Sequence, residues 1–320
     1  MLRYAIARIV WTIPVVFVAV TLTFFLVRSI GGDPFRHGPL VGLTAQGQWQ
    51  KYGDFQPQSI RDNMRRRYSL DLPWYEQYGN YLVGVTTLSL GPSLSYRNRT
   101  VEGIIAEQGP VTLELALLAL AFSLVLGIPI GAASALHARS RFAPLERLGS
   151  SLALSLPAFL VGTILIYLFA VRAGLVPTTG WDGPRSKILP VGTLSLVPLA
   201  YCVRLTRVAV LETLAQDYVR SARAKGLRRR RILVQHVLRN SLVPVLSAVG
   251  PLLGAMVTTI FVVEVVFAVP GLARNYVAAT TARDYPLLMG MTVVLTVFVI
   301  TANLLVDLAL AGLDPRRREG

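Results

Sequence analysis

The stretch LELALLALAFSLVLGIPIGAASAL (Leu113–Leu136) decides the fold class of this chain. Glu114 is its one charged residue, and the other positions are mostly apolar or small. An α-helix needs about 20 such residues to cross the roughly 30 Å of hydrocarbon in a bilayer, where it satisfies its own backbone hydrogen bonds. The stretch therefore predicts a transmembrane helix.

Five further apolar stretches are long enough to do the same. They are Ile9–Val27, Leu148–Val171, Leu189–Val210, Leu242–Phe267 and Leu287–Ala311. Of the 320 residues, 53% are hydrophobic and 15% are charged, and the mean hydropathy is +0.54. Soluble domains carry about 25% charged residues. We therefore expect an all-α integral membrane protein with six transmembrane helices.

The order of these stretches divides the chain into four parts. Residues 1–30 form an N-terminal anchor helix, which we expect to be retained because no small-residue cleavage site follows it. Residues 31–110 form an extracytoplasmic segment, and residues 111–311 form the membrane domain, with a basic loop at 212–240. Residues 312–320 form a cytoplasmic tail.

The distribution of basic residues predicts the orientation. The net charge is +15. If both termini are cytoplasmic, eighteen Lys and Arg residues lie in inside segments and five lie in the two short outside loops. Cytoplasmic loops are enriched in Lys and Arg, so this orientation is favoured. Topology and contact with membrane lipids then account for the positive charge, and no nucleic-acid partner is expected.

The long outer segment carries an aromatic helical face. Gln58–Tyr68 predicts a polar helix, and Trp74, Tyr78 and Tyr81 follow at spacings that place them on one face of another helix. Such a face is typical of an aromatic belt at the membrane surface. It is also compatible with a docking surface for an extracytoplasmic partner, and the two roles can coexist.

The basic loop after the fourth apolar stretch is the candidate functional site. We call its central part the 217–227 segment; its residues are Asp217, Tyr218, Val219, Arg220, Ser221, Ala222, Arg223, Ala224, Lys225, Gly226 and Leu227. We expect a helix over Asp217–Ala224 with Tyr218, Ser221 and Ala222 along one side. Gly226 suits a left-handed turn. A second helix is expected over Arg228–Arg239.

This arrangement leaves two interpretations open. A compact helix–glycine–helix structure with basic residues on its exposed side could insert into a groove of a partner protein. It could equally be a positively charged cytoplasmic loop without a partner.

Three acidic residues lie within apolar stretches or at their ends: Glu114, Glu264 and Asp307. A charge at the centre of a membrane helix costs roughly 2.5–3.5 kcal/mol, so all three are expected to face protein or water. Glu264 and Asp307 could each belong to a translocation path or could tie two helices together.

Motifs for catalysis and for metal binding are absent from the sequence. It contains no Gly-x-x-x-x-Gly-Lys-Ser/Thr phosphate loop, no His-Glu-x-x-His and no Gly-x-Ser-x-Gly. With one cysteine, Cys202, and three scattered histidines, a His/Cys metal cluster is not expected. We therefore expect a protein that is not an enzyme and binds no cofactor or metal of its own.

The 217–227 segment, with His236, Asn240 and Pro244 after it, resembles the coupling loop of ABC importer permeases. The likeness is to the dipeptide/oligopeptide branch. Further blocks typical of that branch occur in the same order: Gly32–Pro34, Leu70–Pro73, Thr112–Leu115, Gly127–Gly131, Leu156–Phe159, Glu264–Leu272, Arg283–Pro286, Asn303–Asp307 and Leu313–Arg316. Arg220 stands where the general Glu-Ala-Ala coupling motif has Glu, so contacts of that Glu are not transferred to Arg220.

The resemblance implies a multi-pass subunit of a bacterial cytoplasmic membrane transporter that imports dipeptides or oligopeptides. The last five helices would form a type I permease core, which pairs with a second homologous permease. Two ATP-binding subunits would use ATP and Mg²⁺ and would receive the 217–227 segment. An extracytoplasmic substrate-binding protein would dock on Gly31–Pro110, in which Phe35–Pro57 is an insertion without a counterpart in the branch.

A transporter or channel that works alone is the alternative. It would require a charged or broken-helix site near the midplane of the membrane, and inverted repeats would support it. We find no repeat, and Glu264 is the one candidate charge.

Overall fold

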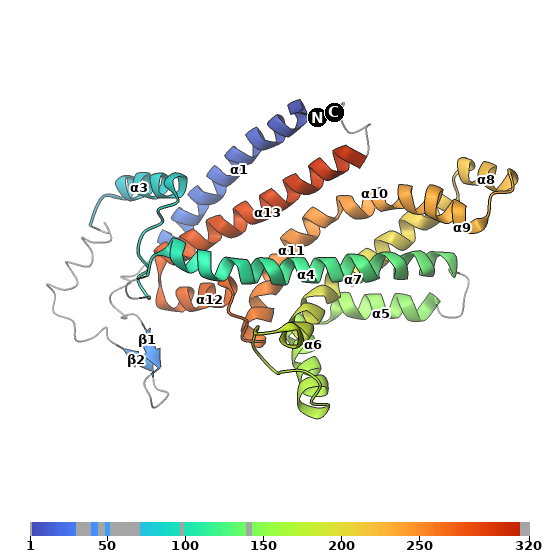
Figure 1. Ribbon diagram of the computed structural model, residues 1–320. Helices are drawn as coiled ribbons and strands as arrows, with labels where there is room; N and C mark the ends of the chain where they lie inside the picture. The colour runs from blue at the N-terminus through green and yellow to red at the C-terminus, as the bar shows by residue number, and fades with distance from the viewer. Residues whose placement is uncertain are drawn as a thin grey trace. The chain divides into compact units, whose positions relative to one another are not determined.

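The computed structural model describes residues 2–29, 40–43, 49–51, 71–96, 99–138 and 143–313, and most of them are helical (Figure 1). The expected helix Gln58–Tyr68, most of the insertion Phe35–Pro57 and residues 314–320 of the tail lie outside these ranges. Within the insertion, β1 (Leu40–Leu43) pairs antiparallel with β2 (Trp49–Lys51). This short strand pair is an addition to the expected all-α architecture.

Five helices in the described ranges are long and apolar enough to cross a membrane, or six if one bent pair counts as a single span. The expected helical membrane architecture is thus confirmed, and the count of six depends on the bent pair. The five are α1 (Leu2–Ser29), α4 (Val101–Leu136), α7 (Pro184–Leu214), α11 (Val249–Val266) and α13 (Tyr285–Leu313).

The bent pair corrects the geometry expected for Leu148–Val171. That stretch is not one straight helix: α5 (Ala143–Ser155) is followed by α6 (Ala158–Leu165), which continues as the π-helix η1 (Ile166–Arg172). The chain bends by 106° between Leu148–Ser155 and Ala158–Arg172. Pro157 has ψ 135° and precedes α6. Because proline lacks an N–H and disfavours helical backbone in the residue before it, α5 ends here.

The expected span Leu242–Phe267 is also interrupted. It is divided between α10 (Arg239–Ser247) and α11, with a turn at Ala248. Pro251 falls within the first turn of α11, where backbone N–H groups have no partner inside the helix. Proline therefore removes no helical hydrogen bond at this position.

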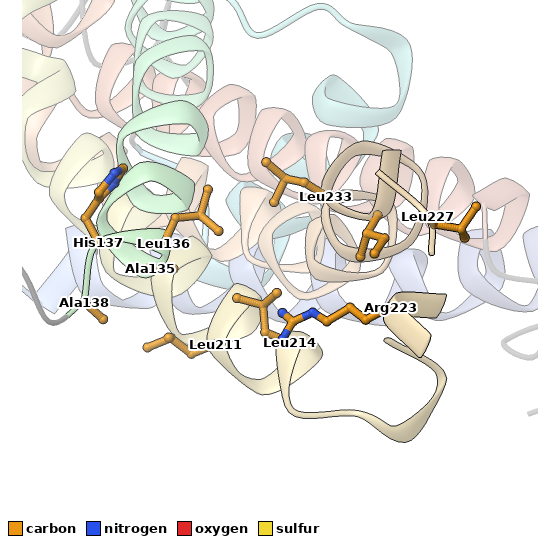
Figure 2. Close-up of a pocket in the computed structure, with 10 residues that line it drawn as sticks. Ala135, Leu136, His137, Ala138, Leu211, Leu214, Arg223, Leu227 and Leu233 are labelled. Atoms are coloured by element: carbon orange, nitrogen blue, oxygen red, sulfur yellow. The ribbon is translucent and has the colours of Figure 1, made fainter. Parts of the chain in front are cut away.

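Two compact units are distinguished by their internal contacts, and each is described by itself. The first comprises Met1–Arg8, Leu113–Val269 and Val299–Gly320. Its central helix is α7, which contacts α5, α6, α10 and α11. A cavity in this unit lies between the ends of α4 and α7 and the chain that follows α7 (Figure 2).

Glycines allow α4 to approach α7 closely. A Cβ atom on Gly131 would lie 2.5 Å from the Val203 carbonyl oxygen, and one on Gly127 would lie 2.7 Å from Cys202 Cβ. One turn earlier, Ser123 Oγ donates a hydrogen bond to the Ser195 carbonyl oxygen at 3.1 Å. Small residues at intervals of four let backbones meet where apolar side chains gain little from leaving lipid.

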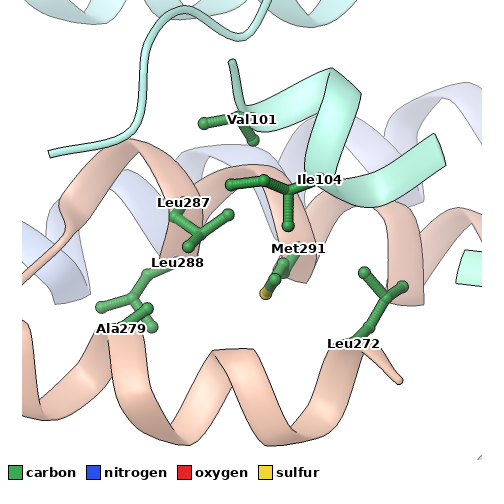
Figure 3. Close-up of a cluster of buried hydrophobic side chains, with 7 residues drawn as sticks. All are labelled: Val101, Ile104, Leu272, Ala279, Leu287, Leu288 and Met291. Atoms are coloured by element: carbon green, nitrogen blue, oxygen red, sulfur yellow. The ribbon is translucent and has the colours of Figure 1, made fainter. Parts of the chain in front are cut away.

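The second unit comprises Ile9–Thr112 and Pro270–Phe298. Its buried cluster combines the first turns of α4, the helix α12 (Leu272–Ala282) and the first turns of α13 (Figure 3). The members are Val101, Ile104, Leu272, Ala279, Leu287, Leu288 and Met291. Beside them, the buried Asp284 carboxylate accepts hydrogen bonds from Ser93 Oγ and, at 3.2 Å, from the Leu287 amide at the start of α13.

The aromatic face expected in the outer segment lies on α3 (Trp74–Thr87). Tyr78 and Tyr81 pack against Phe24 of α1, with ring centroids 5.2 and 5.9 Å apart, and the Tyr78 hydroxyl is 2.7 Å from Thr21 Oγ1. Trp74 remains half-exposed. Part of this face therefore holds α3 on α1, which neither the membrane-belt nor the docking interpretation included.

The close approach at Gly131 gives a stability prediction. We expect Gly131→Ala to destabilise the folded protein by about 1–3 kcal/mol, because the new methyl group cannot fit against Val203 and Thr206. Gly192→Ala in α7 is the control, since its Cβ would meet nothing within 4 Å. Thermal unfolding in detergent should show a lower Tm for Gly131→Ala alone. Equal Tm values for both variants would contradict the close approach of α4 to α7 at Gly131.

Candidate functional site

The 217–227 segment begins where the membrane-spanning α7 ends. After a turn at Ala215, α8 (Asp217–Ala224) starts with Gln216 as its N-cap in an extended conformation. The Gln216 carbonyl accepts hydrogen bonds from the Val219 and Arg220 amides at 3.1 and 3.3 Å. Asp217 lies in the first turn, where a negative charge interacts favourably with the helix dipole.

Gly226 ends this helix as expected. It has φ +72°, the left-handed conformation that glycine adopts without steric cost. The Gly226 amide bonds to the Arg223 carbonyl at 3.0 Å, and the Leu227 amide bonds to the Ala222 carbonyl at 3.3 Å. This pair of bonds is a Schellman motif, which reverses the chain direction and satisfies the last carbonyl groups of a helix.

The helix expected over Arg228–Arg239 is present but differs in form. A short α9 (Arg229–Arg231) leads into a π-helix, η2 (Ile232–Leu238), which continues as α10 without a cap. The Ile232 amide bonds to the Arg228 carbonyl at 3.1 Å. π-Helical turns are rare and occur frequently at functional sites.

A buried apolar cluster holds the 217–227 segment against the membrane helices. Its members are Ala132, Ala135, Val210, Val219, Ala222, Ile232 and Val237. They come from the end of α4, the end of α7, α8 and η2. The side of α8 that carries Tyr218, Ser221 and Ala222 is only partly buried: Val219 and Ala222 are buried, whereas Tyr218 and Ser221 are exposed.

Tyr218 links the two arms of this structure from outside the cluster. Its hydroxyl accepts a hydrogen bond from Asn240 Nδ2 at 2.7 Å. Tyr218 lies in the first turn of α8, and Asn240 lies at the start of α10. The bond therefore ties α8 to the helix that returns towards the membrane domain.

The exposed side of the structure is strongly basic. The exposed cations of this region are Arg220, Arg223, Lys225, Arg228, Arg230, Arg231 and Arg239. Asp217 lies 3.6 Å from Arg220, but both side chains are largely in solvent, so this ion pair is weak. The surface suits contact with acidic groups of a partner protein or with anionic lipid.

A cavity of about 970 Å³ adjoins the 217–227 segment. Figure 2 shows Leu136 of α4, Leu211 and Leu214 of α7, and Leu233 of η2 around it, with the Arg223 side chain extending between the two helical regions. Its walls are thus mostly apolar, and one edge carries a guanidinium group.

The structure places Glu264 and Asp307 in different surroundings. Glu264 in α11 is fully buried, with 0% of its surface exposed. Asp307 in α13 is half-buried. Neither lines the cavity beside the 217–227 segment. Complete burial of Glu264 agrees with the expectation that an acidic residue deep in a membrane helix faces protein or water.

One charged cluster was not expected from the sequence. Glu114 in α4 forms an ion pair with Lys187 in α7 and accepts a hydrogen bond from Trp181 Nε1 at 3.0 Å. The Lys187 ammonium lies 4.9 Å from the centre of the Trp181 ring. Nothing in the local sequence indicates this contact, because Glu114 opens one apolar stretch whereas Lys187 precedes another, more than 70 residues later.

Metal binding has no support in the described part of the chain. Among those residues, no group of three or more His, Cys, Asp or Glu side chains could hold a metal ion.

Comparisons with known proteins agree with this architecture. Residues 127–319 match the family described as "Binding-protein-dependent transport system inner membrane component". The dipeptide transport system permease protein DppB of Bacillus subtilis is 36% identical, over 99% of this chain and 98% of that protein. The oligopeptide transport system permease protein OppB of Haemophilus influenzae is 32% identical, over 99% and 100%.

Solved structures support the fold. An inward-facing structure of the MetNI methionine ABC transporter matches with a TM-score of 0.55 and 16% identity, over 66% of this chain and 96% of that chain. An amino acid ABC transporter crystallised with histidines matches with a TM-score of 0.52 and 17% identity, over 72% and 97%. At these identities the likeness concerns the fold alone.

The apolar cluster gives a prediction about the rigidity of α8. Ile232→Ala should weaken the packing of α8 on the membrane helices by about 2 kcal/mol, a value at the lower end of the range for truncations of buried isoleucine. Amide hydrogens of Asp217–Ala224 should therefore exchange about 30-fold faster. Val234→Ala, at a half-exposed position of the same π-helix, is the control and should leave exchange nearly unchanged. Hydrogen–deuterium exchange by mass spectrometry measures both; identical protection of α8 in the two variants would refute the packing role.

Proposed function

The chain belongs to the family of binding-protein-dependent transport system inner membrane components, and on that basis we propose that it is a permease subunit of an ABC transporter that imports peptides. The observation that carries the proposal is the likeness to a dipeptide and an oligopeptide permease over almost the whole length of this chain and of both relatives. Dipeptides or oligopeptides are accordingly the substrate class.

The orientation follows from the basic residues. Both termini and the 217–227 segment lie on the cytoplasmic side, because this arrangement puts most short basic segments inside. Residues 31–110 lie outside, where they receive the substrate-binding protein. The membrane is the bacterial cytoplasmic membrane, in which such importers reside.

The 217–227 segment connects this subunit to the ATPase. Its compact shape, its basic exposed side and its attachment to the ends of α4 and α7 support this role. One ATP-binding subunit receives α8 in a surface cleft, and a second serves the homologous permease. When ATP brings these subunits together, α8 moves with them.

The motion reaches the membrane through packed side chains. Val219 and Ala222 are buried against the α4 and α7 ends, so a displacement of α8 acts on both helices together. A rigid-body change between two packings of the permease pair then alternates access to the pore. ATP and Mg²⁺ remain in the partner subunits, and this chain supplies no catalytic group.

Reconstitution tests the function. The chain, its sister permease, the ATP-binding subunits and the binding protein are placed in proteoliposomes with ATP on the cytoplasmic side. We expect ATP-dependent uptake of a labelled peptide and retention of the ATPase in a mild-detergent pull-down. If the chain purified stably without any ATPase and peptide uptake did not depend on ATP, the result would instead indicate a transporter that works alone.

Gly226 tests the coupling role. In Gly226→Val, a β-branched residue must adopt φ +72°, which costs about 1–2 kcal/mol. This cost lowers the fraction of molecules in which the 217–227 segment has its native turn about tenfold. Peptide uptake per ATP hydrolysed should fall, measured in the same proteoliposomes. Gly226→Asn is the matched control, since asparagine tolerates the left-handed conformation. Undiminished coupling in Gly226→Val would refute this role for the turn.

A further inference from the structure

The cavity beside the 217–227 segment combines apolar side chains with polar surface. Of its ten lining residues, eight are alanine, leucine or isoleucine. The other two are Arg223 and His137, and no acidic side chain lines it. A volume of about 970 Å³ is at the upper end of the range for small-molecule sites, about 300–1,000 Å³.

The position of the cavity is set by the ends of two membrane-spanning helices. Leu136 is the last residue of α4, and Leu214 is the last residue of α7. The apolar stretch of α4 ends at Leu136, and that of α7 ends at Val210, one turn before Leu214. From these lengths we place the cavity at the headgroup level of the bilayer, next to the end of the hydrocarbon region.

Arg223 supplies positive charge at the apolar wall. Figure 2 shows its side chain extending from α8 towards Leu214. Arg223 forms no ion pair with any carboxylate that the structure describes. His137 Nδ1 lies 2.9 Å from the Ala133 carbonyl oxygen, so this ring nitrogen is engaged by the backbone of α4. Exposed Arg228, Arg230 and Arg231 add to the positive potential nearby.

We propose that this cavity binds one anionic phospholipid of the adjacent leaflet. An acyl chain lies against Leu136, Leu211 and Leu233, and the phosphate group pairs with the Arg223 guanidinium. Arginine suits this role because its planar fork binds two phosphate oxygens at once.

The bound lipid would bridge the membrane helices and the 217–227 segment. Arg223 and Leu227 belong to that segment, whereas Leu136 and Leu214 belong to α4 and α7. Anionic lipid therefore stabilises the segment in its observed position. The inference rests on the membrane-spanning helices and not on the coupling role.

Lipid retention tests the proposal on the purified transporter complex with the full-length chain. The complex is reconstituted in nanodiscs of phosphatidylcholine with phosphatidylglycerol, extracted, and examined by native mass spectrometry. We expect one retained phosphatidylglycerol per copy of this chain. Arg223→Gln should weaken retention about tenfold, since it removes a charged hydrogen bond. Arg230→Gln, which removes an equal charge outside the cavity, should weaken retention much less.

A second variant tests the apolar wall. Ala138→Trp places an indole in the cavity from its partly exposed edge and should also abolish retention. Equal losses in Arg223→Gln and Arg230→Gln would overturn the proposal in favour of diffuse attraction to the basic surface. Displacement by inorganic phosphate alone would show an anion site without an acyl chain. Release of the ATPase from Ala138→Trp with lipid retention unchanged would identify an ATPase segment as the occupant.

Discussion

The close approach of α4 and α7 is the constraint on which the first compact unit depends. Gly127 and Gly131 leave no room for side chains at the crossing, and Ser123 adds a hydrogen bond one turn earlier. In lipid, apolar side chains gain little by leaving their surroundings, so helices associate through close packing and polar contacts. Because α7 also contacts α5, α6, α10 and α11, its position affects most of the unit.

The 217–227 segment is an extension of this crossing. Ala135 lies one turn beyond Gly131, and together with Val210 of α7 it receives the buried residues of α8. The segment can therefore have a fixed position on the membrane helices although one of its sides is in solvent. A rigid attachment of this kind suits a part that transmits motion, because packed interiors transmit displacement with little deformation.

The positions at which helices end depend on single residues and not on the contact between α4 and α7. Pro157 ends α5 because of its missing N–H and its effect on the preceding residue, whereas Gly226 ends α8 because a left-handed residue is required there. Both residues were visible in the sequence. The left-handed turn at Gly226 was predicted, but the 106° bend at Pro157 was not, since proline in a membrane helix is compatible with a continuous span, a kink or a full break.

The sequence by itself determined the membrane-spanning class, the approximate positions of the apolar helices, and the helix–glycine turn of the 217–227 segment. These depend on composition, hydrophobic length and the conformational preference of single residues, which are local properties. Only the tertiary structure decided that Tyr218 pairs with Asn240, that Glu114 meets Lys187, and that Glu264 is buried. These contacts join residues far apart in the chain, and a helix with apolar residues on every side gives no periodic signal of which face meets protein and which meets lipid.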